Sequence, residues 1–169
     1  KVKKMNFNIR AKIILITFGI LFFAIGTNTL INSYVFTREY SDALQSETFV
    51  IGQSLRHQLD KLLRLKIPIE ELIGFEKQCQ DVVNEYKDVS YAMVVDTNGK
   101  ILFHNDPSQH GKILTDPAIL KAVKSKKAVG QVYSQQGEEY YDNTIPIWSI
   151  HDEHIAAVRI GFATKLITY

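Results

Sequence analysis

The strongest constraint on this chain is a stretch of twenty-four residues, Ile13–Phe36, that contains no formal charge. A helix of roughly 20 apolar residues is long enough to cross the hydrocarbon core of a bilayer, which is about 30 Å thick. Lys and Arg concentrate on the cytoplasmic side of such helices, so we expect residues 1–12 to be cytoplasmic and the chain from Thr37 onward to be exported. The basic residues that precede the stretch are Lys1, Lys3, Lys4, Arg10 and Lys12.

A cleaved secretory signal is the alternative interpretation, because it also combines a basic start with an apolar core. Two features favour an uncleaved membrane helix. The densest apolar part, Ile13–Ile25, is followed by residues 26–29, which lack a small-x-small cleavage pattern. The helical pattern then continues as far as Phe36. Both interpretations export the rest of the chain.

The charge of the exported part excludes a nucleic-acid-binding function. The whole chain has a formal net charge of +2, but all 18 acidic residues follow the apolar stretch, against 15 basic ones. The exported part therefore lacks the excess of basic residues that a nucleic-acid-binding surface requires. The single cysteine, Cys79, excludes an internal disulfide and is expected to be a buried, unreactive thiol.

The apolar stretch is expected to continue into a long helix over Thr37–Lys66. This segment has no Pro and one Gly, and its apolar residues recur at helical spacing. Such a stripe packs either against the domain's own core or against a second copy in a parallel dimer. Pro68 ends the helix, and Ile69–Tyr86 resumes helical spacing, divided at Gly74. The stripe consists of Leu44, Ile51, Leu55, Leu59 and Leu62.

The remainder predicts an α+β domain with a five-stranded antiparallel sheet. The Asn98-Gly99 pair marks a tight turn between the first two strands, because Gly supplies positive φ. Asp116 and Pro117 mark the start of a helix. We expect the helices on one face of the sheet, a plan that resembles PAS-like domains. The predicted strands are Tyr91–Val95, Lys100–His104, Val129–Gln135, Tyr140–Ile150 and His154–Thr164, and the predicted helix between them is Ala118–Lys126.

The residues from Tyr91 to Pro107, which read YAMVVDTNGKILFHNDP, resemble the central hairpin of single Cache (PDC-type) extracytoplasmic sensor domains. Three later segments follow in the order expected for that family: Gly111-Lys112, Tyr141–Ile147 and Val158–Phe162. The resemblance implies a prokaryotic transmembrane receptor: a histidine kinase, a diguanylate cyclase or a chemoreceptor. It implies small-molecule sensing, with the ligand, often a carboxylate or amino acid, held between the sheet and the loop after the second strand.

The resemblance also sets the expected organisation, with a second membrane helix and an output module beyond Tyr169. We expect no enzyme activity and no cofactor in this chain, because it contains no hydrolase, nucleotide or haem motif. The expected segments are a cytoplasmic N-terminus at 1–12, a transmembrane helix at 13–36, a membrane-proximal helix at 37–66, the sensor domain at 67–164 and a connection to the second span at 165–169.

The predicted ligand site departs from that of relatives that bind dicarboxylates or citrate. They carry an Arg and a His at the end of the second strand and another Arg on the fourth. Here His104 matches the His, Ile101 stands at the first Arg, and Asp142 lies near the second. A lone His is a poor anchor for a carboxylate, whereas an Asp142 that points into the pocket would pair with an amine, so we expect an amine or amino acid rather than a dicarboxylate. The alternative is that Asp142 is a solvated strand residue.

Aromatic residues that the resemblance places near the pocket are the candidate walls of this site. They are Tyr91, Phe103, Tyr133 and Tyr141. His104 and His110 are weak candidates for metal ligands, and no metal site is expected. A second function remains open: a ligand-free dimerisation or protein-docking domain. We expect a membrane-anchored homodimer in either case.

Overall fold

The computed structural model describes residues 9–135 and 137–164. The chain forms two compact units, Lys1–Tyr40 and Ser41–Tyr169, and helix α1 (Ile9–Leu63) contributes to both. Within the first unit, Lys12–Ser33 has a mean hydropathy of 2.1 and no buried residue. This segment is long and apolar enough to cross a membrane.

In the second unit, α1 from Ser41 onward packs its apolar stripe into the domain's own core. Leu55 and Leu59 have no exposed surface, and Leu62 is partly buried beside them. Of the two roles left open for this stripe, the structure therefore shows core packing. Gly52 lets the helix approach strand β4 (Glu138–Trp148), since a Cβ at this position would lie 2.6 Å from the Ile145 Cδ1 atom. The helix ends five residues before Pro68.

The sheet has the strand order β2-β1-β5-β4-β3, and every neighbouring pair is antiparallel. The turn between β1 and β2 is closed by Asp96, whose carboxylate accepts hydrogen bonds from the backbone N–H groups of Asn98 and Lys100, each at 2.8 Å. Gly99 adopts φ 91° in that turn, as the Asn-Gly pair predicts. The strands are β1 (Tyr91–Asp96), β2 (Ile101–His104), β3 (Val129–Gln135), β4 (Glu138–Trp148) and β5 (His154–Ala163).

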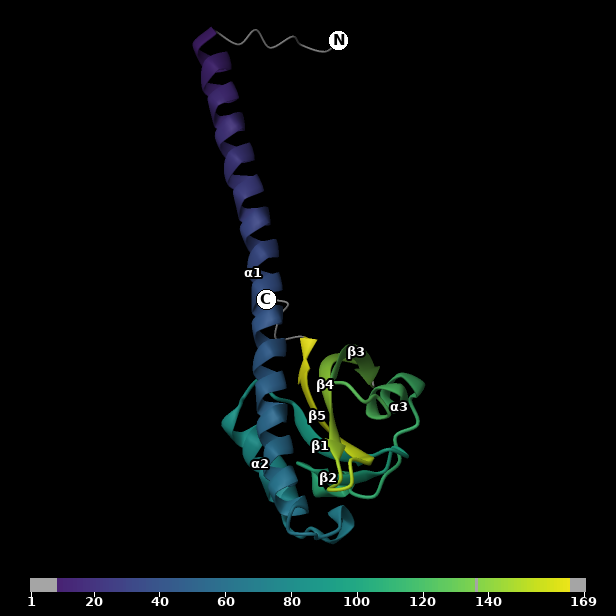
Figure 1. Cartoon of the computed structure of the whole chain (residues 1–169). Coiled ribbons are helices and arrows are strands. Elements are labelled where there is room, and N and C mark those ends of the chain that lie inside the picture. The colour runs from purple at the N-terminus through teal and green to yellow at the C-terminus, as the bar shows by residue number, and fades with distance from the viewer. Residues whose placement is uncertain (1–8, 136, 165–169) are drawn as a thin grey trace. The chain divides into compact units, whose positions relative to one another are not determined.

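Helices cover both faces of the sheet (Figure 1). Helices α1 and α2 (Phe75–Glu85) pack on the face that carries Ala92 and Val94, whereas α3 (Pro117–Val123) packs on the face of Met93 and Val95. The α+β class with flanking helices is confirmed, but the expectation that all helices share one face is wrong. The amphipathic pattern of α3 requires an apolar surface without specifying which face of the sheet provides it.

Local signals explain most helix boundaries. Gly74, at φ 87°, separates a short 3-10 turn (Ile69–Glu71) from α2, as predicted. The Asp116 carboxylate caps α3 by accepting from the Ala118 N–H at 2.7 Å. Helix α3 ends at Val123 rather than at the predicted Lys126. Cys79 is fully buried, and burial, with a smaller contribution from Glu76, raises the pKa of its thiol to about 12.

Candidate ligand-binding site

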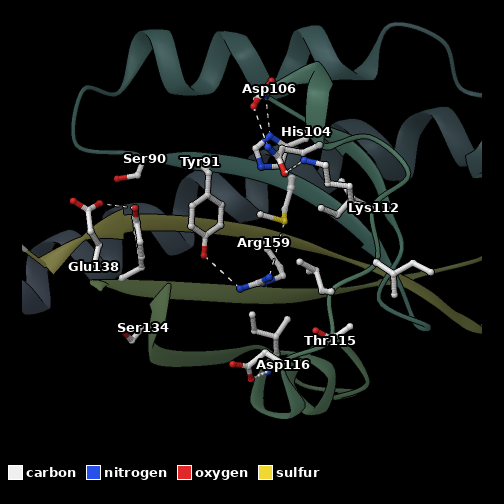
Figure 2. A pocket seen from close by; sticks show the side chains of 17 residues that line it. Ser90, Tyr91, His104, Asp106, Lys112, Thr115, Asp116, Ser134, Glu138 and Arg159 are labelled. Atoms are coloured by element: carbon white, nitrogen blue, oxygen red, sulfur yellow. Dashed lines mark hydrogen bonds between the residues drawn. The ribbon is translucent and has the colours of Figure 1, made fainter. Parts of the chain in front are cut away.

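A cavity of about 840 Å³ lies between the α3-bearing face of the sheet and the segment that leads from β2 into α3 (Figure 2). This is the region where the Cache resemblance places a ligand. The residues that line it are Ser90, Tyr91, Met93, Ile101, His104, Asp106, Gln109, Lys112, Ile113, Leu114, Thr115, Asp116, Ile119, Ser134, Glu138, Tyr140 and Arg159.

An ion pair lies at the floor of this cavity, which Arg159 lines and beneath which Asp142 lies. The Arg159 side chain on β5 donates from Nη2 and Nε to the Asp142 Oδ2 atom on β4, at 3.0 and 3.1 Å. Neither side chain has exposed surface. A buried charge is tolerated only when it is paired and hydrogen-bonded, and here both conditions hold.

Tyr91 completes the floor. Its hydroxyl donates to the Asp142 Oδ1 atom at 2.6 Å, and Figure 2 shows the hydroxyl and the Arg159 guanidinium pointing toward one another. The guanidinium carbon lies 5.8 Å from the centroid of the Tyr91 ring, within cation–π range. Thr144 donates to Asp142 Oδ2 at 3.0 Å, so both carboxylate oxygens are engaged.

His104, at the end of β2, forms part of the wall and is held as a neutral imidazole. Its Nδ1 atom accepts a hydrogen bond from the Asp106 backbone N–H at 2.8 Å, which places the ring proton on Nε2. Burial lowers the pKa of His104 from its ordinary value of 6.5. The Asp106 charge opposes this shift, while Lys112 and Arg159 add to it.

The charged residues of the rim are mostly carboxylates. Asp106 caps the short turn after β2, and hydrogen bonds from Ser108 and Gln109 lower the pKa of its carboxyl. Glu138 accepts from the Tyr140 hydroxyl at 2.8 Å. Asp116 caps α3, and Lys112 brings a positive charge to the rim.

The structure brings two predicted site residues to the cavity, Tyr91 and His104. Asp142 lies beneath the floor with 1% of its surface exposed, so the alternative that it is a solvated strand residue is wrong. Phe103 lies on the opposite face of the sheet, with its ring centroid 5.2 Å from that of Phe75. Tyr141 stacks on Phe162 and lines a separate cavity of about 180 Å³.

The side chain of Tyr133 lies outside the described part of the chain. Arg159 was not among the predicted site residues, although a single Arg between Val158 and Ile160 in an otherwise apolar strand is itself a signal of a buried, partnered charge. Of the weak metal candidates, His110 lies 4.0 Å from Glu76 through its Nδ1 atom. Within residues 9–135 and 137–164, no three His, Cys, Asp or Glu side chains are grouped so as to hold a metal ion.

Comparison with known proteins places this architecture in a family. Residues 54–169 match the family model of the single cache domain 3, and the chain therefore belongs to that family. No curated protein sequence matches the chain.

Solved structures share the fold at low sequence identity. The sensor domain of DcuS from E. coli is 18% identical with a TM-score of 0.60, over 75% of this chain and 93% of that one. An extracellular ligand binding receptor from Desulfohalobium retbaense is 16% identical with a TM-score of 0.62, over 78% of this chain and 24% of that one. A domain of a sensory box/GGDEF family protein from Vibrio parahaemolyticus is 16% identical with a TM-score of 0.64, over 84% of this chain and 63% of that one.

Proposed function

We propose that this chain is the sensing part of a membrane-anchored receptor and binds a small molecule in the 840 Å³ cavity outside the cytoplasm. The observation that carries the proposal is the cavity itself: it lies on the sheet, is bordered by the segment after β2 and is lined by aromatic and hydrogen-bonding groups. The family and the two neighbours described as a sensor domain and a ligand binding receptor support it. The role of this chain is binding, and we propose no catalytic activity for it.

We further propose that Ile13–Phe36 anchors the chain in the plasma membrane, with the basic residues before it in the cytoplasm. The helix length and the charge asymmetry support this orientation. A reporter that works only in an exported compartment, fused after Tyr169, should be active. Activity of a cytoplasmic reporter at the same position would contradict the orientation. In this arrangement the domain passes its signal to a cytoplasmic output module.

The charges around the cavity favour an amine or an amino acid over a dicarboxylate. Arg159 pairs with Asp142, and the other charged side chains among the described lining residues are Lys112, Asp106, Asp116 and Glu138. His104 is neutral because its pKa is lowered. A dianion would meet more negative than positive charge, whereas an ammonium group would meet complementary charge. The amine preference predicted from the sequence is therefore kept, but with Glu138 instead of Asp142 as the carboxylate that pairs with the ligand amine.

A thermal-shift screen of the full chain in lipid nanodiscs tests this ligand class. Primary amines and amino acids should raise the unfolding temperature in a saturable way, and succinate and citrate should not. Glu138→Gln should weaken the response to amines, since a hydrogen bond to a charged group is worth about 1.5–3 kcal/mol. Stabilisation by dicarboxylates alone would contradict the amine preference while leaving the cavity as the ligand site.

We also propose a parallel homodimer that uses the outward face of α1. Phe49 and Val50 stay 37% and 65% exposed there, although the inward stripe is buried. Anchoring in one membrane raises the effective concentration of a second copy. Single cysteines at the exposed Ser46 and Val50 should crosslink in membranes, and one at the buried Leu44 should not. Equal crosslinking at all three positions would contradict this interface.

A second candidate function, protein docking, is favoured by one observation. An apolar groove of about 490 Å³ lies where the end of α1 meets the turn between β4 and β5, and Ile67 and Ile150 are exposed in it. Exposed aliphatic surface of this kind often marks a protein contact. Loss of receptor signalling in Ile150→Asp, with ligand binding unchanged, would support docking. Unchanged signalling would leave ligand sensing as the function.

A further inference from the structure

The ion pair beneath the cavity uses the same donors that an arginine offers to a ligand. A guanidinium recognises a carboxylate through adjacent N–H groups in one plane. In this chain the Nε and Nη2 groups of Arg159 both donate to the Asp142 Oδ2 atom, at 3.1 and 3.0 Å. The Nε–Nη2 edge of Arg159 is therefore occupied by a carboxylate of the protein, while Nη2 also donates to the Tyr91 hydroxyl at 3.4 Å and Nη1 to the Met93 Sδ atom at 4.0 Å.

Neighbouring side chains hold that carboxylate in place. The Tyr91 hydroxyl donates to Asp142 Oδ1 at 2.6 Å, and Thr144 Oγ1 donates to Oδ2 at 3.0 Å. Tyr91 borders the cavity and lies within cation–π range of the guanidinium. A ligand anion approaching from the cavity would have to displace a carboxylate that is held by four side chains, because Gln131 Nε2 also donates to Asp142 Oδ2 at 3.4 Å.

We propose that Asp142 is a built-in counter-ion that sets the charge class of the cavity, because it occupies Arg159 and so excludes carboxylate ligands from the floor. This inference rests on the proposed function only in taking the cavity as the ligand site. Its consequence is specific: removing the Asp142 carboxylate converts the floor into a carboxylate-binding site. Arg159 then becomes a buried cation that has lost its counter-ion, and a small anion is the group that compensates it.

The experiment is chemical complementation of Asp142→Ala with acetate. The substitution removes the carboxylate and leaves space for one of similar size. The full chain in nanodiscs is titrated with sodium acetate and, at equal ionic strength, with sodium chloride, and the unfolding temperature is followed. Acetate should bind Asp142→Ala about 10- to 150-fold more tightly than it binds the wild-type chain, the range for a charge-assisted hydrogen bond.

Two matched chains separate this effect from general salt stabilisation. The double variant Asp142→Ala with Arg159→Met lacks the cation and should lose the acetate response. Thr144→Val removes one hydrogen bond but keeps the ion pair, so it should resemble the wild-type chain. If Asp142→Ala is unfolded in chloride, acetate should restore a cooperative transition.

Equal acetate responses in the wild-type chain and in Asp142→Ala would overturn the proposal. So would an Asp142→Ala chain that stays unfolded in acetate as in chloride, or a double variant that still responds. The acetate readout needs no natural ligand, so a failed amine screen and a failed acetate titration report on different claims.

Discussion

The ring of Tyr91 lies across Gly161, on the neighbouring strand β5, so closely that a Cβ at position 161 would overlap the ring carbons Cε1 and Cζ. Gly161 also stands opposite Asp142 on β4 in the register of the sheet. The missing side chain is therefore what allows Tyr91 to reach over β5 and donate its hydroxyl to Asp142. One glycine thus permits the hydrogen-bonded floor of the cavity.

We predict that Gly161→Ala destabilises the fold by about 1–3 kcal/mol, because the added methyl group overpacks a filled site. Urea unfolding measures the change. The double variant Gly161→Ala with Tyr91→Ala should lose less free energy of unfolding than the two single variants lose together, because removing the ring removes the overlap. Additive costs would show that the ring and the glycine do not constrain one another.

Breaking the buried ion pair should lower the free energy of unfolding far more than breaking a surface ion pair does. Arg159→Met leaves the Asp142 carboxylate buried and uncompensated, and we expect a loss of about 3–5 kcal/mol in the free energy of unfolding. The matched control is Arg56→Met. Arg56 pairs with Asp60 at 3.4 Å on the partly exposed face of α1, and its loss should cost about 0–1 kcal/mol. Similar losses in both variants would contradict the placement of Arg159.

A buried polar contact joins α1 to the sheet and should contribute to stability. Asn143 on β4 donates from Nδ2 to Thr48 Oγ1 at 2.7 Å and to the Gln45 carbonyl at 3.1 Å. Asn143→Ala leaves buried groups without that partner, and we expect a loss of about 1–3 kcal/mol. A double-mutant cycle with Thr48→Val should give a coupling energy well above zero, and a value near zero would exclude a direct interaction.

His104 should make stability depend on pH near neutrality. Burial lowers the pKa of His104 in the folded chain, so below the ordinary value of 6.5 the unfolded chain binds the proton first. The contribution of neutral His104 to the free energy of unfolding is therefore complete above pH 6.5, and it falls as the pH drops toward the lowered pKa of His104 in the folded chain. His104→Asn, which keeps a side-chain acceptor, should flatten the change in stability between pH 7.5 and 5.5. An unchanged slope would show that His104 is not the group that titrates.

Local signals in the sequence predicted the elements of this fold well. The Asn98-Gly99 turn, the Asp116 cap and the break at Gly74 are each specified by a few neighbouring residues, and the structure has all three. The pairing of Asp142 with Arg159 spans seventeen positions and depends on the register of β4 against β5. That register is not readable from local composition.

Alternation along the strands explains why only part of the predicted site lines the cavity. Adjacent residues of a strand point to opposite faces, so Phe103 and His104 belong to different faces, as do Tyr141 and Asp142. The residues predicted to line the site therefore came from both faces of the sheet. Along β2 the alternation is interrupted by an irregularity in the pairing with β1, because Leu102 and Phe103 both pack in the core under α1 and α2 while Ile101 and His104 line the cavity.

The most direct test of the account is whether a small molecule binds in the cavity on the α3-bearing face of the sheet. Thr115 is exposed and lines that cavity, whereas Asn84 is on α2 and does not. For an amine that stabilises the wild-type chain in nanodiscs, calorimetric titration should show affinity lost at least tenfold in Thr115→Trp and unchanged in Asn84→Trp. Full affinity in a folded Thr115→Trp chain would contradict the account, because the ligand would then bind elsewhere.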